Sequence, residues 1–167
     1  MGQFLPLDDL QTYKQTLQHI PHLKDFRGKY LDELFRASEL CDFAAGETIV
    51  EEGEFGHRIF FLLLGEVAVT KKGVPVASIR GYGEIFGEDP ILNQERRAAT
   101  VKAVTPCYCL SVHTQRLEML NDQEQRACFA VIHHICAQVL SRRLKETTEE
   151  LARVENELQV LRSQIVK

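Results

Sequence analysis

The sequence predicts a mainly β domain of the jelly-roll or double-stranded β-helix barrel type, with an N-terminal helical segment and a long C-terminal dimerisation helix. Two observations predict this class. Apolar residues recur at helical spacing near both ends, and the middle of the chain contains short β-prone segments punctuated by glycine. With 167 residues and 44% hydrophobic residues, the chain can bury a core of its own.

Residues 1–40 are expected to form N-terminal helices. From Leu7 to Leu40 the apolar residues fall at steps of three and four, which is the period of an amphipathic helix. Pro21 separates two short helices, because proline disrupts the interior of a helix.

Residues 41–122 are expected to form the barrel. Segments rich in β-branched and aromatic residues recur about every ten residues, as in an antiparallel barrel or jelly roll. They read ETIVEE, RIFFLLLGEVAVT, VPVASI, RAATVKAV and CYCLSV. Lys71, Lys72 and Gly73 predict the turn of a hairpin.

Residues 123–167 are expected to form one long helix, since they contain neither glycine nor proline. A helix of roughly 40 residues is about 60 Å long, more than a small barrel can cover. Its second half has a heptad pattern, which predicts a coiled coil and a homodimer. The alternative is a long solvated helix packed on its own barrel. The heptad core positions are Leu144, Leu151, Leu158 and Ile165, and Leu140, Thr147, Val154 and Leu161.

Composition narrows the classes of function. A formal charge of −4 argues against nucleic acid as a direct partner. Five cysteines without a CxxC pair indicate reduced thiols. The N-terminus lacks the pattern of a signal peptide, and the longest apolar run, Ile59 to Leu64, is too short to span a membrane. We therefore expect a cytoplasmic protein without a membrane partner.

The stretch FGEDPILNQERRAATV, residues 86–101, suggests a binding site. If a strand begins at Arg97, alternation places Arg97 on the same apolar face as Ala99 and Val101. A guanidinium that faces a core requires an anion, because burying an unpaired charge is costly. The alternative is that Glu95, Arg96 and Arg97 form a solvated turn.

This stretch resembles the phosphate-binding cassette of the cyclic nucleotide-binding domain family, which includes catabolite activator protein, kinase regulatory subunits and cyclic nucleotide-gated channels. The shared residues are Phe86-Gly87-Glu88 and Arg97-Ala98-Ala99-Thr100-Val101, and the resemblance runs from about Leu23 to Glu150. It implies that Arg97 pairs with the charged oxygen of a cyclic phosphate, assisted by the N–H of Ala98. It also implies that Gly87 lets the backbone approach and that Glu88 accepts hydrogen bonds from the ribose 2′-hydroxyl.

The resemblance also implies specificity. Members that prefer cyclic GMP often carry Thr or Ser directly after the cassette arginine; Ala98 stands there in this chain, which favours cyclic AMP and makes cyclic GMP the lesser ligand. Residues 137–148 resemble the dimer helix of catabolite activator protein. That likeness places Thr147 and Thr148 over the base and Arg143 beside the cassette.

These features predict a regulatory module that is not an enzyme: it binds a cyclic nucleotide, dimerises and signals to an unidentified protein partner. One alternative is a degenerate barrel serving as a coiled-coil adaptor, because Asp89, Arg96 and His57 depart from the usual pattern of the family. Another is a truncated transcription regulator of the catabolite activator type, which needs a DNA-binding motif after the dimer helix. A metalloenzyme of the cupin type is disfavoured, since His57 and His113 are the histidines near the barrel segments.

Overall fold

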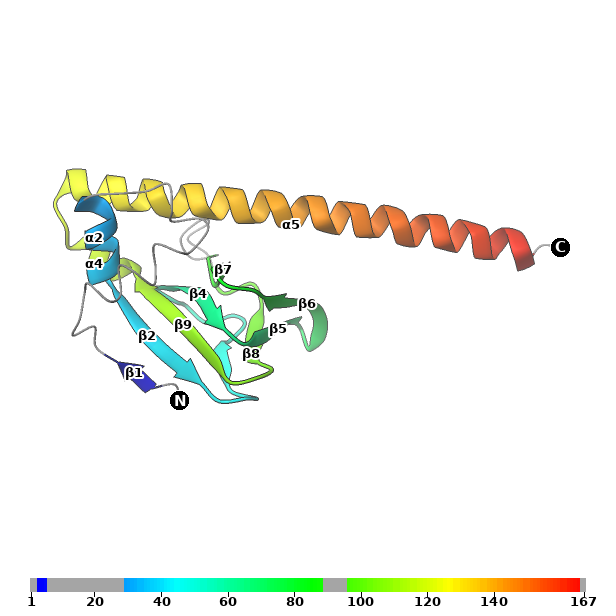
Figure 1. The fold of residues 1–167 in the computed structure, drawn as a ribbon, viewed down its shortest axis with the longest axis horizontal. Coiled ribbons are helices and arrows are strands. Elements are labelled where there is room, and N and C mark those ends of the chain that lie inside the picture. Colours follow the sequence, from blue (N-terminus) through cyan, green and yellow to red (C-terminus); the bar gives the residue numbers. More distant parts are fainter. Residues whose placement is uncertain (1–2, 6–28, 89–95, 166–167) are drawn as a thin grey trace.

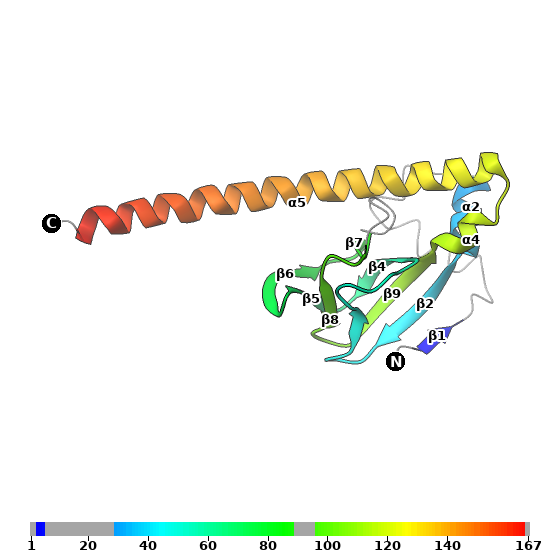
Figure 2. The ribbon, with the colours of Figure 1, turned by 180° about the vertical axis from the view of Figure 1, so that it is seen from behind.

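The computed structural model describes residues 3–5, 29–88 and 96–165. Two antiparallel sheets form a barrel, short helices cover one end of it, and one long helix passes over that end and projects beyond it (Figure 1). The view from behind shows the same arrangement (Figure 2). The predicted barrel class is thereby confirmed, with its flanking helices and its long C-terminal helix.

The barrel consists of a five-stranded and a four-stranded sheet. The first has the order β1 (Gln3–Leu5), β2 (Ser38–Phe43), β9 (Cys107–His113), β4 (Arg58–Leu64) and β7 (Glu84–Phe86). The second has the order β3 (Thr48–Val50), β8 (Thr100–Ala103), β5 (Glu66–Lys71) and β6 (Val74–Arg80). The predicted hairpin turn lies between β5 and β6, where Lys72 and Gly73, with φ of 50° and 78°, form the loop and Lys71 still pairs with Val74.

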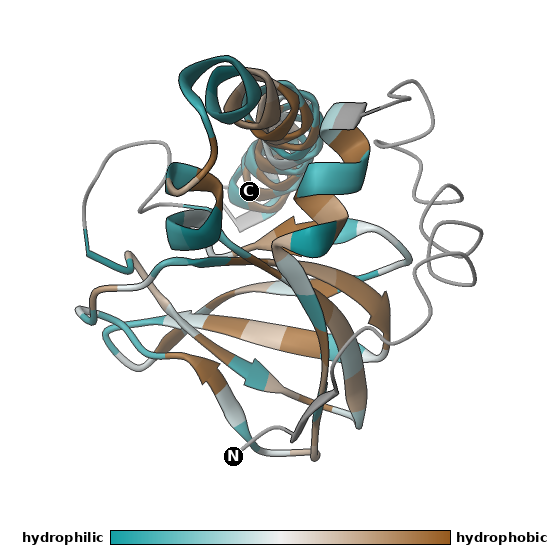
Figure 3. Ribbon diagram, turned by 90° about the vertical axis from the view of Figure 1, so that its left-hand side faces the viewer, coloured by the Kyte–Doolittle hydropathy of each residue, from teal (hydrophilic) through white to brown (hydrophobic). Residues whose placement is uncertain are grey.

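Strand β4 explains why its sequence, RIFFLLL, is apolar without alternation. Ile59 and Phe61 point to one side and pack in a core with the helices, whereas Phe60 and Leu62 point into the barrel and pack in a second core. Both faces of this strand are therefore buried. In Figure 3 hydrophobic colouring accordingly covers both the strands and parts of the helices above them.

Within the described ranges, three helices cover the barrel: α2 (Lys29–Arg36), α4 (Thr114–Glu118) and α5 (Asp122–Ile165). Asn121 starts α5 by accepting hydrogen bonds from the N–H groups of Gln123 and Glu124, at 3.2 and 3.0 Å. The first part of α5 buries one face against the barrel and α2. That face consists of Cys128, Val131, Ile132, Ile135, Cys136 and Val139.

The remainder of α5 leaves the barrel. From Leu140 to Gln164 every side chain is exposed except that of Arg143, which is half-buried. The heptad leucines are among the exposed residues, with Leu144 at 70% and Leu151 at 58%. A helix of 44 residues is about 66 Å long, so its second half projects as a rod with an uncovered apolar stripe.

The prediction of helices throughout residues 1–40 was wrong at two places. Gln3–Leu5 forms β1, because it pairs with β2 along the edge of the sheet. Strand β2 begins at Ser38, so Leu40 belongs to the sheet and pairs with Leu110. The predicted helix from Leu7 to Ile20 lies outside the described residues.

Candidate functional site

A cavity of about 460 Å³ lies between the barrel and α5. This is within the range of roughly 300–1,000 Å³ that small-molecule sites occupy. Strands β3, β5, β6, β7 and β8 and one stretch of α5 supply its walls. The lining residues are Val50, Val69, Ala77, Ser78, Ile79, Arg80, Glu84, Phe86, Gly87, Glu88, Ala98, Ala99, Val101, Arg142, Arg143, Glu146 and Thr147.

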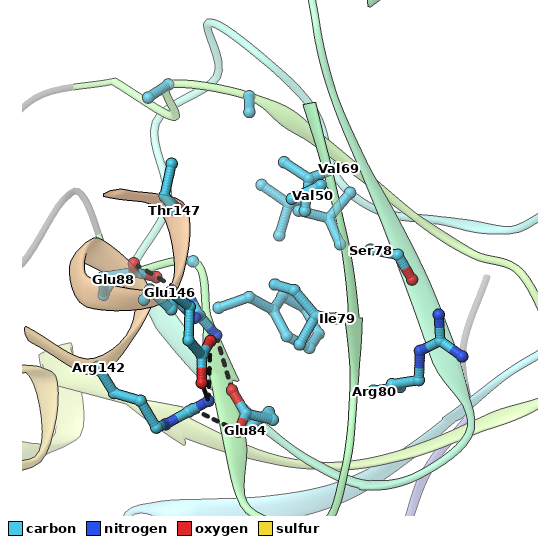
Figure 4. A pocket seen from close by; sticks show the side chains of 17 residues that line it. Val50, Val69, Ser78, Ile79, Arg80, Glu84, Glu88, Arg142, Glu146 and Thr147 are labelled. Carbon is cyan, nitrogen blue, oxygen red and sulfur yellow. Dashed lines mark hydrogen bonds and ion pairs between the residues drawn. The ribbon is translucent and has the colours of Figure 1, made fainter. Parts of the chain in front are cut away.

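The walls of this cavity differ in chemistry. Val50, Val69 and Ile79 form an apolar wall, and Figure 4 shows them opposite Glu88, Glu146 and Arg142. The charged wall gathers Glu84, Glu88 and Glu146 with the arginines of α5 (Figure 4). Such a cavity suits a ligand with one flat apolar part and one part rich in hydrogen-bonding groups.

Six of the eight predicted site residues line this cavity, four from the cassette and two from the helix. They are Phe86, Gly87, Glu88, Ala98, Arg143 and Thr147. Thr148 is not among the lining residues, and its hydroxyl donates to the carbonyl of Leu144 at 2.7 Å. In this orientation of α5, therefore, Thr147 lines the cavity and Thr148 does not.

Arg97 is buried as predicted, with 6% exposure, but for a different reason. Strand β8 begins only at Thr100, after a bend at Ala98 and Ala99, so the argument from strand alternation was wrong. The guanidinium instead donates hydrogen bonds to the carbonyl oxygens of Gly87 and, at 2.8 Å, Arg58. It lines a neighbouring cavity of about 310 Å³ rather than the larger one.

Two glycines make room for this guanidinium. A Cβ added at Gly56 would lie 2.5 Å from Cζ of Arg97, which is too close for any side chain. A Cβ at Gly87 would lie 2.9 Å from Nη1, and Gly87 also has a φ of 75°. The Arg97 guanidinium therefore sits directly behind Gly87, which itself lines the larger cavity.

Arg96 has quite different surroundings from its neighbour. Its side chain is exposed, with Cζ 4.1 Å above the ring of Phe55 and Nη1 donating to the carbonyl of Gly53 at 2.9 Å. The solvated turn that we considered as an alternative thus applies to Arg96 and not to Arg97.

An ion-pair cluster that the sequence did not reveal joins β7 to α5. The carboxylate of Glu84 contacts Arg142 at 2.5 Å and Arg143 at 3.2 Å, and Arg143 also donates to the carbonyl of Ile85. The hydrogen bond and the charge of Glu84 raise the pKa of Arg142. Arg143 additionally lies 3.9 Å from Glu88, so it approaches two of the three carboxylates of this wall.

His113 belongs to another charged cluster, with Glu39, Arg58 and Arg116. Nε2 of His113 lies 3.1 Å from Glu39, while Arg58 and Arg116 approach the same carboxylate at 3.7 and 2.6 Å. Within the described ranges, no group of three or more His, Cys, Asp or Glu residues could hold a metal ion. No described helix combines the length and apolarity that crossing a membrane requires.

Stability should depend on the protonation of His113. Burial, followed by the charge of Arg58, lowers the pKa of His113 below 6.5, so the unfolded chain binds its proton more readily. The free energy of unfolding should therefore fall as the pH drops below about 6.5, and His113→Gln should flatten this dependence. Urea unfolding at pH 7.5, 6.5 and 5.5 measures both slopes, and equal slopes for the two proteins would contradict the assignment.

A closed barrel with a ligand-sized cavity beside a helix defines a binding module. The family described as "Cyclic nucleotide-binding domain" matches residues 40–124, about half of the chain. The chain therefore belongs to the cyclic nucleotide-binding domain family, and it carries a regulatory binding module rather than a catalytic one.

Individual relatives agree with this assignment. The chain is 36% identical to a cGMP-dependent protein kinase of Eimeria tenella over 60% of its own length and 10% of that protein. It is 34% identical to a cAMP-dependent protein kinase regulatory subunit of Eremothecium gossypii, over 56% of its own length and 20% of that protein. A solved cyclic nucleotide-binding domain from Methylobacillus flagellatus shares the fold, with a TM-score of 0.72 and 20% identity. The match covers 88% of this chain and 86% of that one. The chain thus spans only a small part of these two curated relatives.

Proposed function

We propose that this chain is a cytoplasmic sensor that binds cyclic AMP in the 460 Å³ cavity, dimerises through α5 and signals to a protein partner. The observation that carries the proposal is the meeting of Gly87, Glu88 and Ala98 at one cavity, with the guanidinium of Arg97 directly behind Gly87. These are the cassette positions of the family to which the chain belongs.

The phosphate end of the ligand fits beside Gly87 and Ala98. The hydrogen bonds from Arg97 to the carbonyl oxygens of Gly87 and Arg58 fix the orientation of the guanidinium. The absence of a side chain at Gly87 lets a phosphate oxygen come close to the backbone and to that charge. Arg97 would pair with the phosphate from behind this glycine.

The sugar and the base fit the remaining surfaces. Glu88 would accept hydrogen bonds from the ribose, and the apolar wall of Val50, Val69 and Ile79 would cover the purine. Thr147 lines the cavity and offers a hydroxyl to the adenine amine, whereas Thr148 is turned away in this helix orientation. Ala98 has no hydroxyl for the guanine amine, which favours cyclic AMP over cyclic GMP.

A second candidate is an adaptor that dimerises through α5 without a nucleotide. Two observations favour it: Arg97 already donates to protein carbonyls, and Arg143 already lies near Glu88. The exposed heptad stripe serves dimerisation in either case. A truncated transcription regulator is a third candidate, for which the structure offers no specific support.

Calorimetric titration of the whole chain with cyclic AMP and cyclic GMP separates these candidates. The proposal predicts one cyclic AMP site per chain and weaker binding of cyclic GMP, with Ala98→Thr reducing the difference by strengthening cyclic GMP. Absence of heat with either nucleotide at millimolar concentration would favour the adaptor, and tighter cyclic GMP binding would contradict the argument from Ala98.

A further inference from the structure

We propose that Glu84 is a positioning residue that holds α5 over the cavity through Arg142 and Arg143, and that this clasp sets the affinity for the ligand. The second half of this inference rests on the proposed nucleotide binding. The first half, the attachment of the helix, concerns the protein without ligand and can be tested alone.

The clasp stands where the apolar attachment of α5 ends. Val139 is fully buried and is the last buried residue on the helix, and side chains from Leu140 onward are exposed apart from half-buried Arg143. The hydrophobic effect therefore holds α5 only as far as Val139. Residues 140–147, which flank and line the cavity, need another attachment to stay in place.

A single carboxylate, that of Glu84, supplies this attachment. The side chain of Glu84 is 17% exposed, and its two oxygens meet different arginines, Arg142 at 2.5 Å and Arg143 at 3.2 Å. Arg143 adds a hydrogen bond to the carbonyl of Ile85 in the same strand. Charge-assisted contacts of a largely buried carboxylate are stronger than ordinary surface ion pairs.

The cavity is incomplete without this part of the helix. Arg142, Arg143, Glu146 and Thr147 form one of its walls, and Figure 4 shows the clasp at the edge of that wall. A ligand that touches both barrel and helix binds the attached helix better than the detached one. Its apparent affinity therefore depends on the fraction of chains in which the clasp is closed.

Arg143 connects the clasp to the ligand more directly. It lies 3.2 Å from Glu84 and 3.9 Å from Glu88, the carboxylate proposed to accept the ribose hydroxyl. A clasp that holds Arg143 also holds the side chain beside Glu88. Loss of Glu84 should therefore affect both the helix and the orientation of the sugar-binding carboxylate.

The test uses the whole chain with Glu84→Gln, Arg142→Gln and the double variant. Without ligand, amide hydrogen exchange should become faster in residues 140–147 of both single variants. It should stay the same as in the wild type in residues 128–139. Titration with cyclic AMP should show about tenfold weaker binding for each. The double variant should lose much less than the product of the two single effects, because both changes break the same contact.

Lys145→Gln is the matched control. Like Arg142→Gln, it removes one positive charge from α5, but Lys145 pairs with Glu149 on the same helix, at 3.9 Å, and not with the barrel. It should change neither the exchange nor the affinity. The clasp proposal would be overturned if hydrogen exchange in residues 140–147 were unchanged in Glu84→Gln. It would also be overturned if Lys145→Gln changed exchange and affinity as much as Glu84→Gln does. If wild-type protein does not bind cyclic AMP, the proposed function fails, while the exchange measurement still decides whether the clasp exists.

Discussion

Replacing Arg97 by Ala should weaken cyclic AMP binding at least tenfold. Arg97 is 6% exposed, and its guanidinium lies behind the one glycine of the cassette that lines the cavity. A hydrogen bond to a charged group contributes about 1.5–3 kcal/mol, which corresponds to roughly 10- to 150-fold in affinity. Competition against a fluorescent cyclic AMP analogue measures the change.

Arg96→Ala is the matched control, since it removes the same side chain one position earlier. That side chain is exposed and contacts Phe55 and Gly53 rather than the cavity. Arg96→Ala should therefore change the affinity for cyclic AMP by no more than about twofold, since most substitutions at exposed positions have small effects. Because Arg97 also bonds to Gly87 and Arg58, thermal unfolding of Arg97→Ala must show that the barrel is intact. An intact variant that binds as wild type would contradict the assigned role.

Replacing Leu151 and Leu158 together by Lys should convert the proposed dimer to a monomer. Both leucines are heptad core residues on the exposed half of α5, at 58% and 48% exposure, and neither packs in the two buried cores. Each leucine buried in a dimer contributes about 1.5–3 kcal/mol, and two lysines in place of them add repulsion across the interface. Sedimentation equilibrium measures the mass.

Ala152→Lys introduces the same side chain on the outer face of the helix, next to Leu151. It should leave the dimer intact. The barrel should unfold at the same temperature in all three proteins, because the exposed rod is separate from its cores. A monomeric wild-type chain at micromolar concentration would show that the stripe does not make a homodimer.

Much of the fold could be predicted because its signals are local and periodic. Alternation and turn glycines indicate the strands, and the turn at Lys72 and Gly73 appears where expected. The short strand β1 could not be predicted, since three residues carry no period and it exists only through pairing with β2. Leu40 fitted a helical spacing, but its place in β2 is set by pairing with β9.

The candidate site was predictable where a motif fixes the backbone and unpredictable where distant side chains meet. Gly87 and Ala98 line the cavity, and both belong to the cassette motif that the sequence displays. Glu84 and Arg142 are 58 residues apart, and nothing in the sequence marks them as partners. Two acceptors of Arg97 are backbone carbonyls, which every residue possesses, so the sequence could indicate its burial but not these partners.

The central claim is that a cyclic nucleotide occupies the cavity between the cassette and α5, with its phosphate beside Gly87 and Ala98. Amide chemical shifts of the ¹⁵N-labelled chain, followed during titration with cyclic AMP, test the claim most directly. We predict that the largest saturable changes occur at Gly87, Ala98 and Thr147. Changes confined to the second cavity, at Gly56 and Gln115, or no change at millimolar ligand, would contradict it.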